Sequence, residues 1–300
     1  MKAQELESKL QRTGIRSLSA YLEITKLPSV ILLAFTAAGA MVVAAGGQPI
    51  QPGVFLRAVF AVALGCAGAN TLTCYIDRDI DPLMERTRRR PLPTRRIDPP
   101  QLALYWGLFL SALSLILAWF INPLSCFWGL VGLLDNVLVY SLLAKRRSPL
   151  NVILGGFSGG VPVLYGWAAI RNQVALTPLL IAALVVLWIP NHIWNLAIFH
   201  TEDYRRVKVP MLPAVYSFQK TVRCTVATVL LMFGCSIALY FVGEFGRLYL
   251  KAALALGAAV VAGNLWLFFR PSRKLAWQLY KLSSPYLFLL FAAMTLDVLA

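Results

Sequence analysis

Carboxylates and guanidinium groups are gathered in one polar run of the sequence, NTLTCYIDRDIDPLMERTRRRPLP, at residues 70–93. The run follows directly on an apolar stretch, VFLRAVFAVALGCAGA. Its acidic and basic members are Asp77, Asp79, Asp81, Glu85, Arg78, Arg86, Arg88, Arg89 and Arg90. Carboxylate oxygens are ligands that Mg²⁺ prefers, and arginine binds phosphate oxygens through a bidentate fork. This combination of residue types is suited to binding a magnesium ion together with a diphosphate.

Helical spacing selects some members of this run. Asn70, Asp77 and Asp81 are spaced i, i+7, i+11, so on a continuous helix they lie within about 40° of one another. Asp79 lies about 200° around the helix from Asp77 and is expected to point away from the site. The pair Asp81-Pro82 is also typical of a helix N-cap followed by proline at the first helical position, so capping is an open alternative for Asp81.

A second polar run, PNHIWNLAIFHTEDYRRVKVPMLP at residues 190–213, also ends in carboxylates. Four of its residues are spaced i, i+3, i+7 and i+11 and share one face if the helix continues that far. They are His192, Asn195, Phe199 and Asp203. Two carboxylate clusters can then face each other at the rim of a cavity. An apolar cavity below such a rim would suit an isoprenoid tail, which predicts chemistry on a lipid diphosphate, with the metal and the arginines stabilising the leaving group.

The elements that must position these side chains are membrane helices. Of the 300 residues, 59% are hydrophobic, 14% are charged and the mean hydropathy is +0.69, more apolar surface than a soluble domain of this size can bury. Apolar stretches of about 20 residues, the length that a bilayer requires, recur along the chain. The predicted fold is an all-α polytopic membrane bundle of nine transmembrane helices around a central cavity, with its polar loops on the cytoplasmic side. The nine helices are expected at 28–46, 53–76, 102–121, 124–143, 151–170, 177–199, 222–243, 248–269 and 283–299.

The net charge of +15 is distributed unevenly along this topology. If the N-terminus is cytoplasmic and nine helices alternate in direction, 24 of the 28 lysines and arginines lie on one side. The positive-inside rule explains this asymmetry, so no nucleic-acid partner is expected. Topology alone is also the favoured interpretation of Arg88, Arg89, Arg95 and Arg96. We therefore expect a multi-pass protein of the cell (plasma) membrane with a cytoplasmic N-terminus.

Two units are expected along the chain. Residues 28–300 form one intramembrane domain, and residues 1–27 form a cytoplasmic N-terminal segment. In that segment, Leu6, Leu10, Ile15, Leu18 and Leu22 are spaced as in an interfacial amphipathic helix. Five cysteines stand singly, without the spacing of a metal site, and are expected to be packed thiols.

The motifs resemble those of the intramembrane prenyltransferases, and within them the branch that farnesylates haem, the haem O synthases. The segments that carry the resemblance are YIDRDIDPLMERTRRRPLP, KRRSPLNVILGG, GWAA and HIWNLAIFHTEDYRRVKVPMLP. The resemblance extends through most of the chain. It implies transfer of a farnesyl group from farnesyl diphosphate to a vinyl group of haem B (protohaem IX), with addition of water to give a hydroxyethylfarnesyl side chain. It further implies Mg²⁺ as the cofactor, the lipid bilayer as the surroundings and haem A synthase, the next enzyme, as a candidate partner.

The resemblance also implies roles for individual residues. The expected ligands of Mg²⁺ and its diphosphate are Asp77, Asp81, Asp203 and Glu202. Further diphosphate contacts are expected from Asn70, Thr73, Arg86, Arg90, Lys145 and Arg146, of which the four basic residues also suit haem propionates. His192 is the first candidate for contacting haem or handling a proton, and it forms the expected catalytic set with Asp77 and Asp203. The expected neighbours of the haem are Trp194, Tyr140 and Asn136, with Trp167 and Tyr165 as further candidates to flank the porphyrin.

Several positions depart from the family pattern. The family has asparagine where this chain has Thr73, so the role of this one residue is open, although threonine can still donate to phosphate. The usual proline before the histidine is Asn191, and a lysine–aspartate–aspartate–tyrosine run reads TEDY at residues 201–204. The usual lysine–proline pair near the first helix appears as Lys26-Leu27-Pro28.

Structural interpretations stay open for some of these residues. A buried histidine such as His192 is more often a hydrogen-bonded structural group than a ligand. Asp135 lies in the middle of a predicted membrane helix, where a charge is costly and by default indicates function. It is expected to be neutral or paired with a neighbouring helix. Asn136 and Tyr140 share a face at i, i+4 and are expected to line the cavity.

Two other functions also stay open. The same carboxylates would serve prenyl transfer onto an aromatic quinone precursor, although Trp194, His192 and the PMLP run favour haem. A transporter or channel would also contain polar residues among its helices. Transporter sites, however, usually lie near the bilayer centre on broken helices, whereas the charges here gather at the basic rim.

Overall fold

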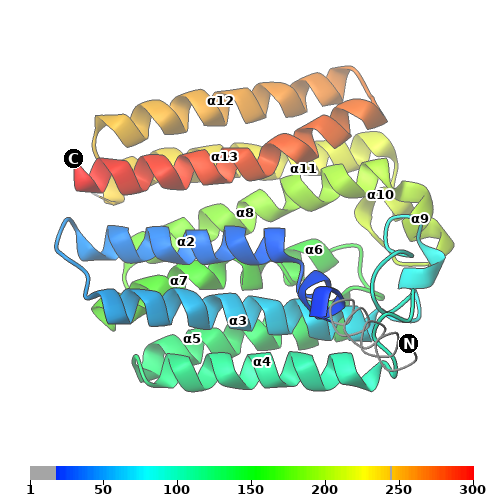
Figure 1. Ribbon diagram of the computed structural model, residues 1–300. Helices are drawn as coiled ribbons and strands as arrows, with labels where there is room; N and C mark the ends of the chain where they lie inside the picture. The colour runs from blue at the N-terminus through cyan, green and yellow to red at the C-terminus, as the bar shows by residue number, and fades with distance from the viewer. Residues whose placement is uncertain (1–17, 244) are drawn as a thin grey trace, which may run out of the picture.

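Long helices lie side by side in the computed structural model, which describes residues 18–243 and 245–300 (Figure 1). Within this described part, nine helical segments are long and apolar enough to cross a membrane. The predicted number of spans and the all-α class are confirmed. Figure 1 shows the short helices α9 and α10 and the beginning of α2 at one end of the bundle and the C-terminus at the other. We call the end with α9, α10 and residues 77–100 the basic end.

The membrane-length segments follow one another along the chain. They are α2 (Leu27–Ala45), α3 (Pro52–Ile76), α4 (Gln101–Trp119), α5 (Pro123–Leu134) with a π-helical continuation (Asp135–Ala144), α6 (Asn151–Leu154) with α7 (Phe157–Arg171), α8 (Leu176–Phe199), α11 (Phe218–Val242), α12 (Arg247–Phe269) and α13 (Arg273–Leu299). The short elements are a 3₁₀ turn (Asp81–Leu83), α9 (Thr201–Arg206) and α10 (Leu212–Val215). Residues 18–24 are helical, with Leu18 and Leu22 exposed; the remainder of the predicted amphipathic helix lies outside the described residues.

Two helices begin earlier than the sequence pattern predicts. The helix expected to start at residue 222 starts at Phe218, and the one expected at 283 starts at Arg273. Serine caps both true starts: Ser217 accepts a hydrogen bond from the backbone N–H of Lys220, and Ser272 accepts one from that of Leu275. Such caps satisfy N–H groups that have no partner within the helix. The basic first turns hid these starts, because they interrupt the apolar pattern.

The two helices that carry the polar runs end before their carboxylates. Helix α3 ends at Ile76 and Asp81 begins a separate 3₁₀ turn, while α8 ends at Phe199 and Asp203 belongs to α9. The expectation of two continuous helical stripes is therefore wrong beyond these ends. Pro82 contributes to the first break, because proline and the residue before it disfavour continuation of a helix.

Irregular backbone also replaces the two regular helices that were expected at 124–143 and 151–170. The first continues from α5 as a π-helix, in which the N–H of Lys145 donates to the carbonyl of Tyr140 five residues earlier. The second is interrupted between α6 and α7. Gly155 lies at this interruption, and a Cβ there would be only 2.4 Å from Cβ of Tyr140. The glycine thus permits close packing of the broken helix on the π-helical segment.

The outer surface of the bundle is apolar. Phe241, Phe269 and Phe120 are 77%, 73% and 69% exposed, which suits a protein surrounded by lipid rather than water. Polar residues are buried inside instead, among them Asp77, Asn191, Asn195 and Asn264. Residues that cost free energy in a membrane are therefore directed toward the interior of the bundle and its basic end.

Candidate active site

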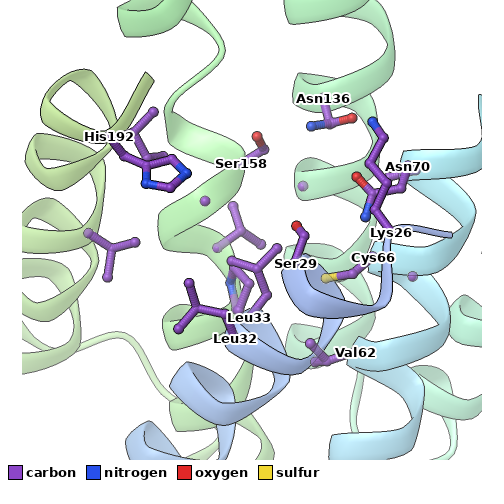
Figure 2. Close-up of a pocket in the computed structure, with 18 of the residues that line it drawn as sticks. Lys26, Ser29, Leu32, Leu33, Val62, Cys66, Asn70, Asn136, Ser158 and His192 are labelled. Atoms are coloured by element: carbon purple, nitrogen blue, oxygen red, sulfur yellow. The ribbon is translucent and has the colours of Figure 1, made fainter. Parts of the chain in front are cut away.

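A cavity of about 920 Å³ lies among α2, α3, α5 with its π-helical continuation, α7, α8 and α13. Its wall is mostly apolar, with residues such as Leu32, Leu33 and Val62 (Figure 2). Figure 2 shows Lys26, Asn70 and Asn136 together on one side of the cavity and His192 on the other. The volume is within the range of pockets that hold small organic ligands.

Asp77 lies at the basic end, just after the last residue of α3, and is almost fully buried. Its carboxylate contacts the ammonium group of Lys145, and Nη2 of Arg146 is 3.8 Å from its Oδ1. That Oδ1 atom is buried and has no hydrogen-bond partner among the described residues. Burial opposes the charged form of Lys145, but the Asp77 carboxylate together with Tyr140 and Tyr204 outweighs burial, so the pKa of Lys145 lies above its usual value.

Asp79 and Asp81 have different surroundings. The side chain of Asp79 is 59% exposed and forms two 2.7 Å hydrogen bonds with Arg146, which lower the pKa of Asp79. Asp81 is buried, and Nη1 of Arg90 donates to both of its carboxylate oxygens, at 3.2 and 3.0 Å. The Asp81 side chain forms an ion pair, and no side-chain cap is found at the start of its 3₁₀ turn.

The second run reaches the first through Asp203. This buried carboxylate accepts hydrogen bonds from the backbone N–H groups of Glu85 and Arg86, at 3.0 and 3.2 Å. The two runs therefore meet, although 118 residues separate the first pair along the chain. Glu202 has a 60% exposed side chain that pairs with Arg205 and Arg273, and it takes no part in this contact.

The four predicted metal ligands do not converge on one point. In residues 18–243 and 245–300, no group of three or more His, Cys, Asp or Glu side chains is arranged to hold a metal ion. The contacts of these carboxylates give the reason, because Asp77 and Asp81 contact cations, whereas Asp203 binds peptide N–H groups.

The charged residues around Asp77, Asp81 and Asp203 form a rim at the basic end, and a hydrogen bond near this rim reaches the cavity wall. Thr73 donates to Oδ1 of Asn136 at 3.0 Å, and Asn136 lines the cavity. Tyr140 also lines it, and its ring is 5.9 Å from Nζ of Lys145. Of the predicted site residues, the structure thus places Asn70, Asn136, Tyr140 and His192 on the cavity wall, while Thr73 lies beside Asn136 and Lys145 beside Tyr140 outside this wall.

His192 is held by its neighbours on the cavity wall. Its Nδ1 is 2.6 Å from the hydroxyl of Ser283, and its ring stacks on Trp188 with centroids 4.7 Å apart. The ring of Tyr280 also packs against the His192 ring, with centroids 4.6 Å apart. The ring is thus oriented by one nitrogen, which leaves Nε2 available to the cavity.

The aromatic wall differs from the predicted one. Trp194 is buried in a hydrophobic cluster at the basic end, with Ile80 and Met84 among its neighbours, and does not line the cavity. Trp194 lies two positions from His192 and so faces about 200° away on the helix. Trp167 is likewise outside the wall, whereas Tyr165 is part of it. Trp188, four residues before His192, was missed although helical spacing alone indicates it.

The expected pairing of Asp135 is found, whereas Lys26 was not among the predicted site residues. Asp135 accepts a hydrogen bond of 2.8 Å from the backbone N–H of Ser158, in the first turn of α7, so it pairs with a neighbouring helix. Lys26 lines the cavity, although the sequence indicated only a displaced lysine–proline pair. The sequence feature that could have indicated Lys26 is the position of a lysine directly before the first apolar span.

Comparisons with known proteins agree with this architecture. A sequence profile described as the UbiA prenyltransferase family matches residues 32–291. A protoheme IX farnesyltransferase of Desulforudis audaxviator (strain MP104C) is 54% identical over 290 residues, covering 96% of this chain and 91% of the relative. A protoheme IX farnesyltransferase 2 of Cenarchaeum symbiosum (strain A) is 40% identical over 306 residues, covering 96% of this chain and 98% of the relative.

Solved structures share the fold. A structure described for digeranylgeranylglyceryl phosphate synthase in membranes has a TM-score of 0.78 at 20% identity, covering 94% of this chain and 99% of that one. A UbiA homologue from Archaeoglobus fulgidus, bound to DMAPP and Mg²⁺, has a TM-score of 0.67 at 17% identity, covering 93% of this chain and 98% of that one. These likenesses show that the chain has the same fold as these proteins.

Proposed function

Because the chain belongs to the UbiA prenyltransferase family, we propose that it transfers a farnesyl group from farnesyl diphosphate to a vinyl group of haem B, forming haem O. The observation that carries this proposal is the apolar cavity of about 920 Å³ in contact with the paired acidic and basic groups of the rim. The curated relatives that are 54% and 40% identical over nearly their whole length, both protoheme IX farnesyltransferases, support haem as the acceptor.

The residues at the rim fit a magnesium diphosphate. The buried Oδ1 of Asp77 has no hydrogen-bond partner among the described residues and is a suitable metal ligand. Mg²⁺ usually needs only one or two carboxylates, with phosphate oxygens and water completing its shell, so Asp77 with Asp81 or Asp203 would suffice. When bound, Mg²⁺ neutralises charge on the departing diphosphate. The A. fulgidus homologue bound to Mg²⁺ with DMAPP or GPP supports a metal-dependent prenyl transfer in this family.

The basic residues would hold the diphosphate. Lys145, Arg90 and Arg146 each have a carboxylate partner in the free protein and can exchange it for phosphate oxygens when substrate binds. Arg86 is held nearby, because its backbone N–H binds Asp203. Stabilising the leaving diphosphate makes cleavage of the C1–O bond of farnesyl diphosphate easier, since the bonding electrons depart with the oxygen.

The cavity would protect the allylic cation formed by that cleavage. Its wall is mostly apolar and has few groups that bind water, and the aromatic faces of Trp188, Tyr280 and Tyr165 can stabilise a cation. The haem vinyl group then attacks C1 of the farnesyl chain. Water adds to the resulting cationic carbon and loses a proton, which gives the hydroxyl group of the product.

His192 is the residue best placed to handle this proton. Ser283 holds its Nδ1, so Nε2 can bind the attacking water or the haem from one side of the cavity. Asn136 and Tyr140 would contact the acceptor from other parts of the wall. His192→Gln is expected to lower the turnover number by about 10² to 10⁴-fold, the usual contribution of a general base.

The direct test uses purified protein in detergent with haem B, farnesyl diphosphate and Mg²⁺. A more hydrophobic haem, with the mass of one farnesyl group and one water added, is expected by chromatography and mass spectrometry. If an aromatic quinone precursor is prenylated and haem is untouched, the proposed acceptor is wrong.

The orientation of the protein is also part of the proposal. The 24 basic residues on the side of the N-terminus support a cytoplasmic basic end and a location in the plasma membrane. Tags accessible from the cytoplasm at residue 1 and from outside at residue 300 test this orientation. Delivery of the product to haem A synthase is the corresponding partner hypothesis, which co-purification tests.

A further inference from the structure

Lys26 is the one charged residue among the described residues that line the cavity. It lies immediately before α2, next to Asn70 and Asn136 and across the cavity from His192 (Figure 2). No carboxylate forms an ion pair with its ammonium group in the described part of the chain. Arg90 and Lys145, in contrast, are paired with Asp81 and Asp77. The described residues of the cavity wall therefore include one lysine without an ion-pair partner and no carboxylate.

The backbone of Lys26 is in an unfavourable conformation. Its φ and ψ are 57° and 58°, the left-handed region that a residue with a Cβ rarely adopts. Helix α3 holds this turn in place: Asn70 donates to the carbonyl of Thr25 at 2.9 Å, and the Cys74 thiol lies 3.8 Å from the carbonyl of Ile24. Strained residues that the surrounding structure fixes are concentrated at ligand sites.

The electrostatic surroundings of Lys26 also favour the binding of an anion beside it. Burial lowers the pKa of Lys26, and the nearby cations Arg90 and Lys145 also lower it, whereas Cys74 and Asp77 oppose them. An anion bound beside Lys26 would remove this penalty. Lys26 lies on the same side of the cavity as Asn136, which is hydrogen-bonded to Thr73 near the charged residues of the rim. His192 lies on the opposite side of the cavity.

We propose that Lys26 binds the diphosphate of farnesyl diphosphate where it joins the farnesyl chain, and that Asn70 acts mainly by fixing the Lys26 turn. The proposal rests on the proposed function and adds to it a binding residue on α2's side of the cavity. Asn70 is thereby a positioning residue, because its amide nitrogen is already bound to Thr25. A porphyrin propionate is the other anion that could reach this lysine, and the experiment separates the two.

The decisive variant is Lys26→Gly, because it has opposite effects on stability and on binding. Glycine relieves the left-handed backbone and should raise the melting temperature, while loss of the ammonium group should weaken binding of farnesyl thiodiphosphate in the presence of Mg²⁺. A lost charge-assisted hydrogen bond corresponds to an increase in Kd of about 10- to 100-fold. The KM for haem is expected to stay unchanged, and Lys26→Arg is expected to retain most of the binding.

The chain provides a matched control in Lys208. This residue has a φ of 55°, lies exposed at the basic end and does not line the cavity. Lys208→Gly should raise the melting temperature similarly and leave both substrates unaffected. Lys26→Gln, which keeps a Cβ, serves as the second variant if the glycine disturbs the turn.

The outcomes distinguish this inference from the proposed function. If the Lys26→Gly and Lys26→Gln proteins bind the thiodiphosphate as well as the wild-type protein does, Lys26 is not a diphosphate ligand. A raised KM for haem alone would reassign Lys26 to a propionate and overturn the proposal. If the wild-type protein binds the thiodiphosphate through Lys26 but leaves haem unmodified, the diphosphate site stands and the choice of acceptor fails.

Discussion

The hydroxyl of Thr73 donates to the side-chain carbonyl of Asn136 at 3.0 Å and so joins α3 to the π-helical segment between the rim and the cavity. Thr73 is buried and is also 3.3 Å from the hydroxyl of Ser141. The residue that departs from the family pattern is thus an internal contact that fixes a cavity-lining side chain. A role as a direct phosphate ligand is not needed to explain it.

Thr73→Val is expected to lower kcat/KM by roughly tenfold and the stability by about 1 kcal/mol, because Asn136 loses its partner while the shape is kept. Thr71→Val is the matched control. Thr71 is buried two residues earlier and bonds only to the carbonyl of Ala67 in its own helix, so its loss should affect stability alone. Equal losses of activity in the two variants, measured by steady-state kinetics, would refute a special role for Thr73.

Asp77→Ala and Asp203→Ala are each expected to abolish turnover while the protein stays folded in the membrane. For Asp203 the charge can be separated from its structural contacts. Asp297, at the opposite end, also accepts two backbone N–H groups, from Gly246 and Tyr249. Asp203→Asn and Asp297→Asn should lower the melting temperature alike, but only Asp203→Asn should lose activity, by more than 100-fold. Normal turnover in both Asp77→Ala and Asp203→Ala would refute the diphosphate assignment.

Lys145→Met is expected to reduce stability by about 3–5 kcal/mol, because it leaves the buried Asp77 carboxylate without its main cation. The double variant Asp77→Asn with Lys145→Met should recover much of that loss, since no charge is then left unpaired. Arg147→Met, at an exposed neighbouring position, is the control. Thermal unfolding in detergent measures all four proteins, and a double variant no more stable than Lys145→Met would contradict this account.

Chelation of divalent ions is expected to abolish turnover, and added Mg²⁺ to restore it. Mg²⁺ alone should leave the melting temperature unchanged, because Asp77 and Asp81 are already paired with lysine and arginine in the free protein. Mg²⁺ together with farnesyl thiodiphosphate should raise it through binding to the folded state. A large rise with Mg²⁺ alone would instead indicate a metal site that is complete before substrate binds.

Gly155→Ala is expected to displace the Tyr140 ring from the cavity wall, because the added Cβ would lie 2.4 Å from Cβ of Tyr140. Overpacking of this kind typically costs about 1–3 kcal/mol, and here it should also raise the KM for the acceptor. Gly53→Ala has no neighbouring atom within 4 Å of the new Cβ and should be neutral or slightly stabilising. An unchanged KM in Gly155→Ala would show that Tyr140 does not contact the acceptor.

The spans could be predicted because length and apolar character are sufficient to identify a membrane helix. The serine-capped starts of α11 and α13 could not be predicted, because their first turns are basic and resemble loops. The ends of α3 and α8 were missed for a related reason. Periodicity says which residues share a face of a helix, but it contains no information about where the helix stops.

Prediction of the site was limited by side-chain pairing. Helical spacing indicated Asn70, Asn136 and His192, which do lie on the cavity wall. Helical spacing could not show that Asp77 pairs with Lys145 and Asp81 with Arg90, because these contacts depend on how separate loops fold together. Lys26 was overlooked because a basic residue beside a membrane span is normally interpreted as a topology signal.

The contact of Asp203 with the amides of Glu85 and Arg86 has a consequence for biosynthesis. The ribosome must add 118 residues after Glu85 before Asp203 exists, which at about 5–20 residues per second takes roughly 6–24 s. During that interval the acidic loop after α3 has no carboxylate to hold it. The contact that joins the two polar runs can therefore form only after residue 203 has been synthesised, when the loop after α3 has long been complete.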